Sequence, residues 1–154
     1  MKINIIYHDF SSNVIIDVEV LSFIIKKLKV KLKPVYVNVN NYKCEEAEIN
    51  LFIETINYSY FDKAKYNIFV PNQQYFSRNQ IELLDSFDMI FAKSKYIYEI
   101  FKPLVSEEKL EYIGWRSPDI SIPAAVKSYE EYLVFYQDAV FFPVQNIIDL
   151  WKED

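Results

Sequence analysis

The chain has almost no glycine. Its 154 residues include a single one, Gly114, whereas an average chain of this length has about 11. Glycine-rich loops that hold phosphates need several glycines in one short stretch. The sequence therefore excludes the G-x-G-x-x-G, Walker A and G-x-S-x-G motifs. Any ligand must be held by other groups.

Cysteine, histidine and positive charge are also scarce. Cys44 and His8 are the sole members of their types, which excludes an internal disulfide, a cysteine-based zinc site and the usual histidine-rich metal sites. We therefore expect no metal and no cofactor. Asp and Glu outnumber Lys and Arg by 22 to 17, which gives a net charge of −5. This balance argues against nucleic acid as a partner, since nucleic acid is held mainly through its phosphates.

Long hydrophobic runs are missing as well. No apolar run has the roughly 18 residues of a membrane-spanning helix, and the N-terminus lacks the apolar region of a signal peptide. We therefore predict a cytoplasmic protein with no membrane partner. The composition is rich in Ile, Lys, Asn and Tyr, as in proteins from AT-rich genomes such as those of many viruses. For a viral protein the compartment is the host cytoplasm.

Short apolar runs alternate with helical patterns along the chain. Strands are expected at 2–8, 34–39, 49–53, 67–70, 88–92, 110–113 and 132–136. Helices are expected at 14–28, 77–87, 94–102 and 144–151, with a linker at 116–130. This alternation predicts an α/β fold with a Rossmann-like, mostly parallel sheet of about six or seven strands and helices on both faces.

In such a sheet, ligands bind beyond the carboxyl ends of the strands. The strand bodies are apolar, and polar groups follow several strand ends. Glu54 follows the third strand, where its carboxylate could act as a base or hold a sugar hydroxyl; the alternative is an exposed strand-end carboxylate. His8 ends the first strand and Asp9 follows it, and the two could form an acid–base pair. The alternative is that the histidine is only hydrogen-bonded by the Asp or by a helix cap. These three residues are the candidate catalytic groups.

Further polar residues near the strand ends are candidates for ligand binding. Uncharged side chains after the fourth strand suit hydroxyl recognition, but such residues also build turns. The Ser-Lys pair that opens the helix at 94–102 offers an anion site or a plain cap. After Gly114, an Arg-Ser pair could clamp a phosphate, and the tryptophan could stack on a ligand or pack between lobes. These candidates are Ser12, Asn13, Asn72, Gln73, Gln74, Ser94, Lys95, Trp115, Arg116 and Ser117.

Four short elements carry a resemblance to a known family. They are Ile53-Glu54-Thr55, Val70-Pro-Asn-Gln-Gln-Tyr-Phe76, Phe91-Ala-Lys-Ser-Lys95 and Tyr112-Ile-Gly-Trp-Arg-Ser117. Their order and spacing resemble the N-terminal half of a GT-B glycosyltransferase. In one group of that family, strands end in Ile-Glu-His-like, Pro-Asn-x-Glu-Trp-Phe-like, Lys-Ser-like and Gly-Phe-x-Ser-like elements. The resemblance covers residues 1–120 and implies one Rossmann-like lobe that faces a second lobe across a sugar-nucleotide cleft.

The chain departs from that family after residue 120. The second lobe usually supplies most contacts to the donor nucleotide, but here only about one strand and one helix follow, at 121–154. A Gly-Lys-Ser-like stretch with another Lys is usual at this point, and the resemblance implies that it neutralises donor phosphates. This chain has Tyr136-Gln-Asp-Ala-Val-Phe-Phe-Pro143 instead.

Two functions are compatible with this pattern. The first is a glycosyltransferase-like protein that binds a nucleotide sugar, a nucleotide or a glycan and is not active alone. The second is a non-catalytic protein that captures a small molecule such as a nucleotide signal.

Residues 132–144 are almost wholly apolar or aromatic. Left exposed, such a segment would cause aggregation. It can fold back onto its own lobe or pair with a second chain. We favour a homodimer, with Phe135, Phe141, Phe142 and Trp151 at the interface.

Overall fold

The computed structural model describes residues 1–10, 12–29, 31–41 and 43–115, except the side chains of residues 12, 13 and 41. Contacts divide the chain into two compact units, Met1–Asp119 and Ile120–Asp154. All elements described below belong to the first unit. The predictions for Arg116, Ser117, the linker, the last strand and helix, and the dimer contacts lie outside the described residues.

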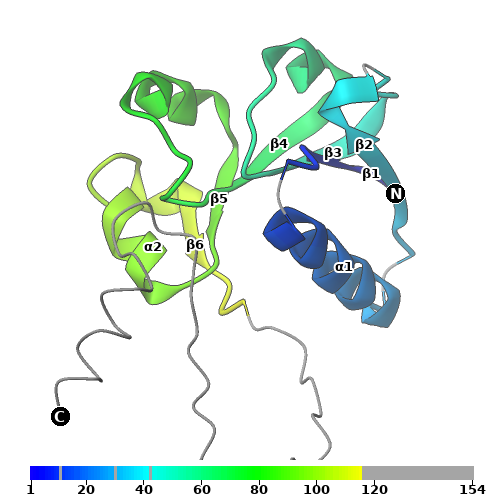
Figure 1. Cartoon of the computed structure of the whole chain (residues 1–154), viewed down its shortest axis with the longest axis horizontal. Helices are drawn as coiled ribbons and strands as arrows, with labels where there is room; N and C mark the ends of the chain where they lie inside the picture. Colours follow the sequence, from blue (N-terminus) through cyan, green and yellow to red (C-terminus); the bar gives the residue numbers. More distant parts are fainter. Residues whose placement is uncertain (11, 30, 42, 116–154) are drawn as a thin grey trace, which may run out of the picture. The chain divides into compact units, whose positions relative to one another are not determined.

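The first unit contains a six-stranded sheet in which every neighbouring pair is parallel (Figure 1). The strands are β1 (Lys2–Tyr7), β2 (Lys33–Asn38), β3 (Ala47–Ile53), β4 (Ala64–Val70), β5 (Met89–Ala92) and β6 (Leu110–Tyr112). Their order is β2-β1-β3-β4-β5-β6. The predicted Rossmann-like α/β fold is therefore confirmed. The order reverses between β1 and β3, and the carboxyl ends of these two strands flank the place where open α/β sheets bind ligands.

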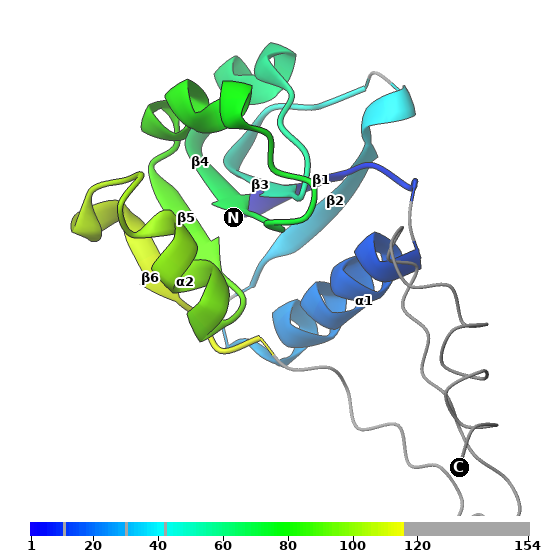
Figure 2. The same cartoon turned by 60° about the vertical axis from the view of Figure 1, so that its left-hand side comes forward.

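Helices cover both faces of the sheet. The helix α1 (Ser12–Lys27) packs on one face, and η2 (Tyr58–Lys63), η3 (Arg78–Ser86) and α2 (Lys95–Phe101) pack on the other. Figure 2 shows α1 apart from the 3-10 segments, with strands between them. Right-handed crossovers require this division, because the chain moves from β1 to β2 in one direction and from β3 to β6 in the other. Two further 3-10 turns are η1 (Val39–Asn41) and η4 (Glu107–Lys109). None of the helices in the described part of the chain has the length and apolar character needed to cross a membrane.

The helix α1 forms as its sequence pattern predicts. Its buried residues Val14, Val18, Leu21 and Ile25 recur every three or four positions and belong to one core cluster with strand residues such as Ile5. Two lysines lie in its last turn, where cations interact favourably with the helix dipole.

The segment predicted as a helix at 77–87 instead forms 3-10 turns, η3. Its apolar residues explain the difference. Ile81, Leu84 and Phe87 are spaced three apart, and Leu84 and Phe87 are buried. A 3-10 helix has three residues per turn, so this spacing directs all three side chains to one side.

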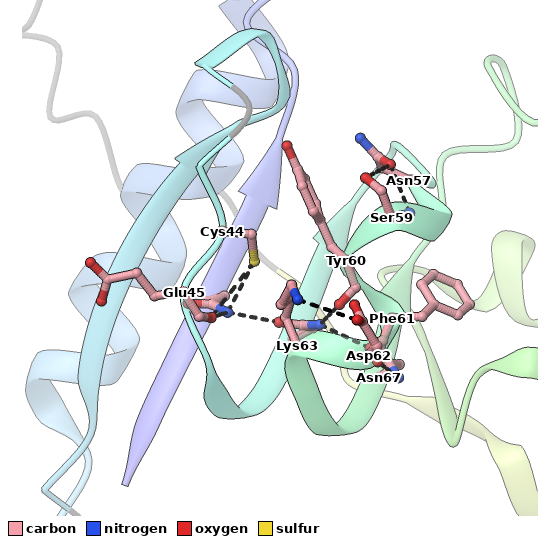
Figure 3. A network of polar contacts seen from close by, with 11 residues as sticks. Cys44, Glu45, Asn57, Ser59, Tyr60, Phe61, Asp62, Lys63 and Asn67 are labelled. Carbon is pink, nitrogen blue, oxygen red and sulfur yellow. Dashed lines mark hydrogen bonds and ion pairs between the residues drawn. The ribbon is translucent and has the colours of Figure 1, made fainter.

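Three buried asparagines lie side by side on neighbouring strands in the middle of the sheet, where the sequence pattern predicts apolar strand bodies. Asn4, Asn50 and Asn67 lie in register on β1, β3 and β4. Asn4 Nδ2 donates to Asn50 Oδ1 at 2.9 Å, and Asn50 Nδ2 donates to Asn67 Oδ1 at 3.0 Å. Asn50 and Asn67 also donate to the backbone carbonyls of Tyr60 and Phe61 in η2 (Figure 3). This asparagine ladder ties η2 to the sheet and fixes the strand register.

Candidate functional site

A buried charge cluster lies at the carboxyl-terminal edge of the sheet. Glu54 follows β3, Lys93 follows β5, and Asp17 lies in the second turn of α1. Lys93 Nζ donates to Asp17 Oδ2 at 2.5 Å and to Glu54 Oε1 at 2.6 Å. The side chain of Glu54 is only 1% exposed, and those of Lys93 and Asp17 are 14% exposed. The cluster therefore links α1 to two strand ends through largely desolvated charges.

Lys93 carries a firmly held proton. Burial lowers the pKa of its ammonium, because it disfavours the charged form. The hydrogen bonds to Asp17 and Glu54, together with their negative charges, outweigh this effect, and the pKa of Lys93 lies above its ordinary value. Lys93 therefore acts as a cation that positions two carboxylates, and not as a base.

The backbone at Glu54 is strained. Its φ of 56° lies in the left-handed region, which costs a non-glycine residue on the order of 1–3 kcal/mol. The Glu54 N–H donates to the carbonyl of Val70 at 2.9 Å, and Asn72 Nδ2 donates to Glu54 Oε1 at 3.1 Å. These bonds and Lys93 hold the carboxylate in one position at the end of β3.

Three buried polar atoms at this edge lack a hydrogen-bond partner among the described residues. They are His8 Nδ1, Glu54 Oε2 and Gln73 Oε1. His8 follows β1, Glu54 follows β3, and Gln73 follows β4, and these strands are neighbours in the sheet. Buried polar groups in folded proteins nearly always have partners. The edge is therefore suited to a ligand that carries several hydrogen-bonding groups.

The other residues predicted after β1 and β4 lie near this edge. Asp9 Oδ1 accepts from Asn40 Nδ2 at 3.0 Å and lies 3.9 Å from His8 Nδ1, so His8 and Asp9 are neighbours without a direct hydrogen bond. Asn72 has two roles, because its Oδ1 also accepts from the Gln74 N–H at 3.1 Å. It therefore shapes the turn after β4 and also holds Glu54. Gln74 itself is exposed.

The residues at the starts of the two helices have different roles. Ser12 and Asn13 begin α1, directly after the loop that follows β1. Ser94 caps α2, because its Oγ accepts a hydrogen bond from the Ile97 N–H at 3.2 Å. Of the two roles that the sequence allowed for Ser94, an anion site or a helix cap, the structure shows the cap. Lys95 borders a separate hollow with Glu99 and residues of β6.

Trp115 packs against the core cluster under α1. The backbone N–H of Trp115 donates to the backbone carbonyl of Lys93 at 2.9 Å. The tryptophan also lines a cavity of about 690 Å³ between α1 and the sheet residues Val70 and Phe91. The lining is apolar apart from Glu19, and none of the polar residues at the strand ends contributes to it. This cavity therefore offers little to a ligand rich in hydroxyl groups.

Four residues of the edge were not among the predicted site residues: Phe10, Asp17, Tyr75 and Lys93. The sequence did contain an indication for Asp17. This acidic residue lies three positions after Val14 and four before Leu21, so a helix places it on the same buried face as these two core residues. Lys93 also had a signal, since it directly follows a strand. The two aromatic residues had none, because their contact joins loops that lie far apart in the sequence.

The described residues contain no group of three or more His, Cys, Asp or Glu side chains that could hold a metal ion. Comparison of the chain with models of protein families, with curated proteins and with solved structures found no match.

Proposed function

We propose that this chain is a glycosyltransferase-like lobe that binds a hydroxyl-bearing small molecule and does not transfer sugar alone. The ligand is a nucleotide sugar, a nucleotide or a glycan, and it binds at the carboxyl-terminal edge of the sheet. The observation that carries this proposal is the set of three buried polar atoms after β1, β3 and β4 that have no partner among the described residues. Ligand hydroxyls both donate and accept hydrogen bonds, so they can satisfy a carboxylate, an amide oxygen and an imidazole nitrogen together.

The charge cluster favours binding without turnover, which is the second candidate function. Stabilisation of a leaving diphosphate requires positive charge aimed at it. Lys93 is the cation of the cluster, and it already donates to two carboxylates. It therefore has little charge to offer a phosphate.

Replacing Gln73 with methionine is expected to weaken ligand binding about tenfold without lowering stability. The change removes a buried amide oxygen that has no partner among the described residues, so the folded chain loses no hydrogen bond there. A bound ligand loses one hydrogen bond, and a tenfold change corresponds to about 1.4 kcal/mol. Calorimetric titration with UDP-glucose, UDP and maltotriose measures binding, and thermal unfolding measures stability.

The matched control is Gln74→Met, in the exposed neighbouring residue, which should leave both quantities unchanged. Wild-type protein that binds no nucleotide sugar, no nucleotide and no glycan at millimolar concentration would refute the proposal. Equal affinity of the Gln73→Met variant and wild type would refute the role of this edge.

The purified 154-residue chain is expected to transfer no sugar. We expect no labelled oligosaccharide and no release of UDP above the rate in buffer when the chain is incubated with radiolabelled UDP-glucose and maltotriose. The reason is the paired state of Lys93 at the edge. Sustained formation of labelled product, in proportion to the amount of chain, would show that the chain is an active transferase.

A further inference from the structure

Two exposed aromatic rings stand at the same edge of the sheet. Phe10, in the loop after β1, is 50% exposed, and Tyr75, in the turn after β4, is 47% exposed. Their ring centroids are 5.3 Å apart, and the ring of His8 lies 5.2 Å from that of Phe10. Exposed apolar surface surrounded by polar residues often marks a binding site. The contact between the two loops thus presents a small aromatic surface to solvent.

This aromatic surface adjoins the polar cluster through Asn72. The Tyr75 N–H donates to the Asn72 carbonyl at 3.1 Å, and the Asn72 side chain donates to Glu54. One turn therefore positions a ring face and also holds the buried carboxylate. The oxygen of Gln73, which has no hydrogen-bond partner among the described residues, lies in the same turn. An apolar face and several hydrogen-bonding groups are thus available to one ligand.

The charge of the edge disfavours phosphate. Among the residues that the structure describes, Asp9, Asp17 and Glu54 place three carboxylates there, against the ammonium of Lys93, which two of them already engage. These carboxylates would repel the negative charge of a phosphate group placed close to them, most strongly where the carboxylates are buried. The edge therefore discriminates against a diphosphate and in favour of an uncharged ligand.

We propose that Phe10 and Tyr75 form a stacking subsite for an uncharged hexose ring of a glycan, next to Glu54 and Asn72. This inference rests on the proposed function and specifies its ligand class. A hexose presents apolar C–H groups on its ring faces and hydroxyls around its rim. The C–H groups suit the negative face of an aromatic ring, and the hydroxyls suit the amides and carboxylates. The two rings meet at 80°, so they form a corner and not a parallel slot for a flat base.

The test measures binding of neutral and phosphorylated compounds to the full chain. Saturation-transfer NMR and calorimetric titration are carried out with maltotriose, cellotriose and N-acetylated chitotriose, and with uridine, UDP and UDP-glucose. We expect at least one trisaccharide to bind, with saturation strongest on its ring C–H protons, and more tightly than UDP. The variants Phe10→Ala and Tyr75→Ala should weaken that binding about tenfold. Tyr75→Phe, which keeps the ring, should bind like wild type.

Tyr66→Ala is the matched control. Tyr66 is 45% exposed and lies in β4 itself, away from the carboxyl end of that strand, so its loss should leave binding unchanged. Binding of UDP or UDP-glucose without any trisaccharide would overturn this inference and leave the proposed function standing. If the Phe10→Ala and Tyr75→Ala variants both bind a trisaccharide as tightly as wild type, this inference is overturned and the proposed function again stands. Failure of all six compounds to bind wild type would overturn the proposed function and this inference with it.

Discussion

Replacing Lys93 with methionine is expected to lower the free energy of unfolding by about 3–5 kcal/mol. The ammonium of Lys93 is the shared partner of Asp17 and Glu54, and all three side chains are largely buried. Without it, two carboxylates face each other in a poorly solvated place. Urea denaturation of the variant and wild type at pH 7 measures the loss.

The pH dependence separates this charge effect from a packing effect. Because the pKa of Lys93 is raised in the folded chain, its contribution is fully present below the ordinary lysine pKa and disappears as pH rises through the raised value. The Lys93→Met variant never has this contribution, so its deficit relative to wild type should shrink as pH rises through the raised pKa of Lys93. The triple variant Asp17→Asn, Glu54→Gln, Lys93→Met should recover most of the stability. A deficit below about 1 kcal/mol, or one that the triple variant retains, would contradict the assigned role of Lys93, since removing one partner of a buried pair normally costs several times more.

The sequence was sufficient to predict the fold because each element carries a local signal. The strands are short runs rich in apolar residues, α1 has a clear apolar stripe, and Pro71 and Pro103 stand just after β4 and α2. A parallel sheet then brings residues from separate strand ends together. For this reason the sequence pattern alone predicts that His8, Glu54 and Asn72 lie at one edge.

The details of the site depend on contacts that local patterns do not encode. Phe10 and Tyr75 meet only because β1 and β4 lie on either side of β3. The left-handed backbone of Glu54 follows from its tertiary bonds and not from its residue type, which disfavours that conformation. In sequence, Ser94 was compatible with a cap or an anion site, and Asn72 with a turn or hydroxyl recognition. The hydrogen bonds show that Ser94 caps α2, whereas Asn72 shapes the turn after β4 and also supports Glu54, a role that the sequence did not indicate.

The asparagine ladder is the feature that sequence reasoning most clearly missed. Each of three predicted strands contains one asparagine among apolar residues, at Asn4, Asn50 and Asn67. One polar residue in a strand is unremarkable, but three in register form a continuous line of hydrogen bonds. A shift of one residue in any strand would move its asparagine to the opposite face. The ladder therefore selects the correct pairing of β1, β3 and β4, the strands that carry the candidate site.

The substitution Asn50→Asp is expected to destabilise the fold by at least about 3 kcal/mol at pH 7, since an unpaired charge would be buried. Asn50 is fully buried, and its Nδ2 donates to the Tyr60 carbonyl at 2.6 Å and to Asn67 Oδ1 at 3.0 Å. The aspartate would place an oxygen against these two acceptors and a charge in the core. Urea denaturation across a range of pH measures the effect.

The control for this substitution is Asn50→Leu, whose side chain has the same branching as that of asparagine but carries no charge and no hydrogen-bonding group. It removes the same donors, so it should also destabilise the chain, but by an amount that does not change between pH 4 and pH 7. The folded Asn50→Asp variant should have its introduced carboxyl at a raised pKa, since burial favours the neutral acid. The folded state then binds the proton more tightly than the unfolded state, so stability rises as pH falls through the raised pKa toward the ordinary value of about 4. If the two variants show the same loss at every pH, the charge has no part in the effect, and Asn50 contributes only through its hydrogen bonds and packing.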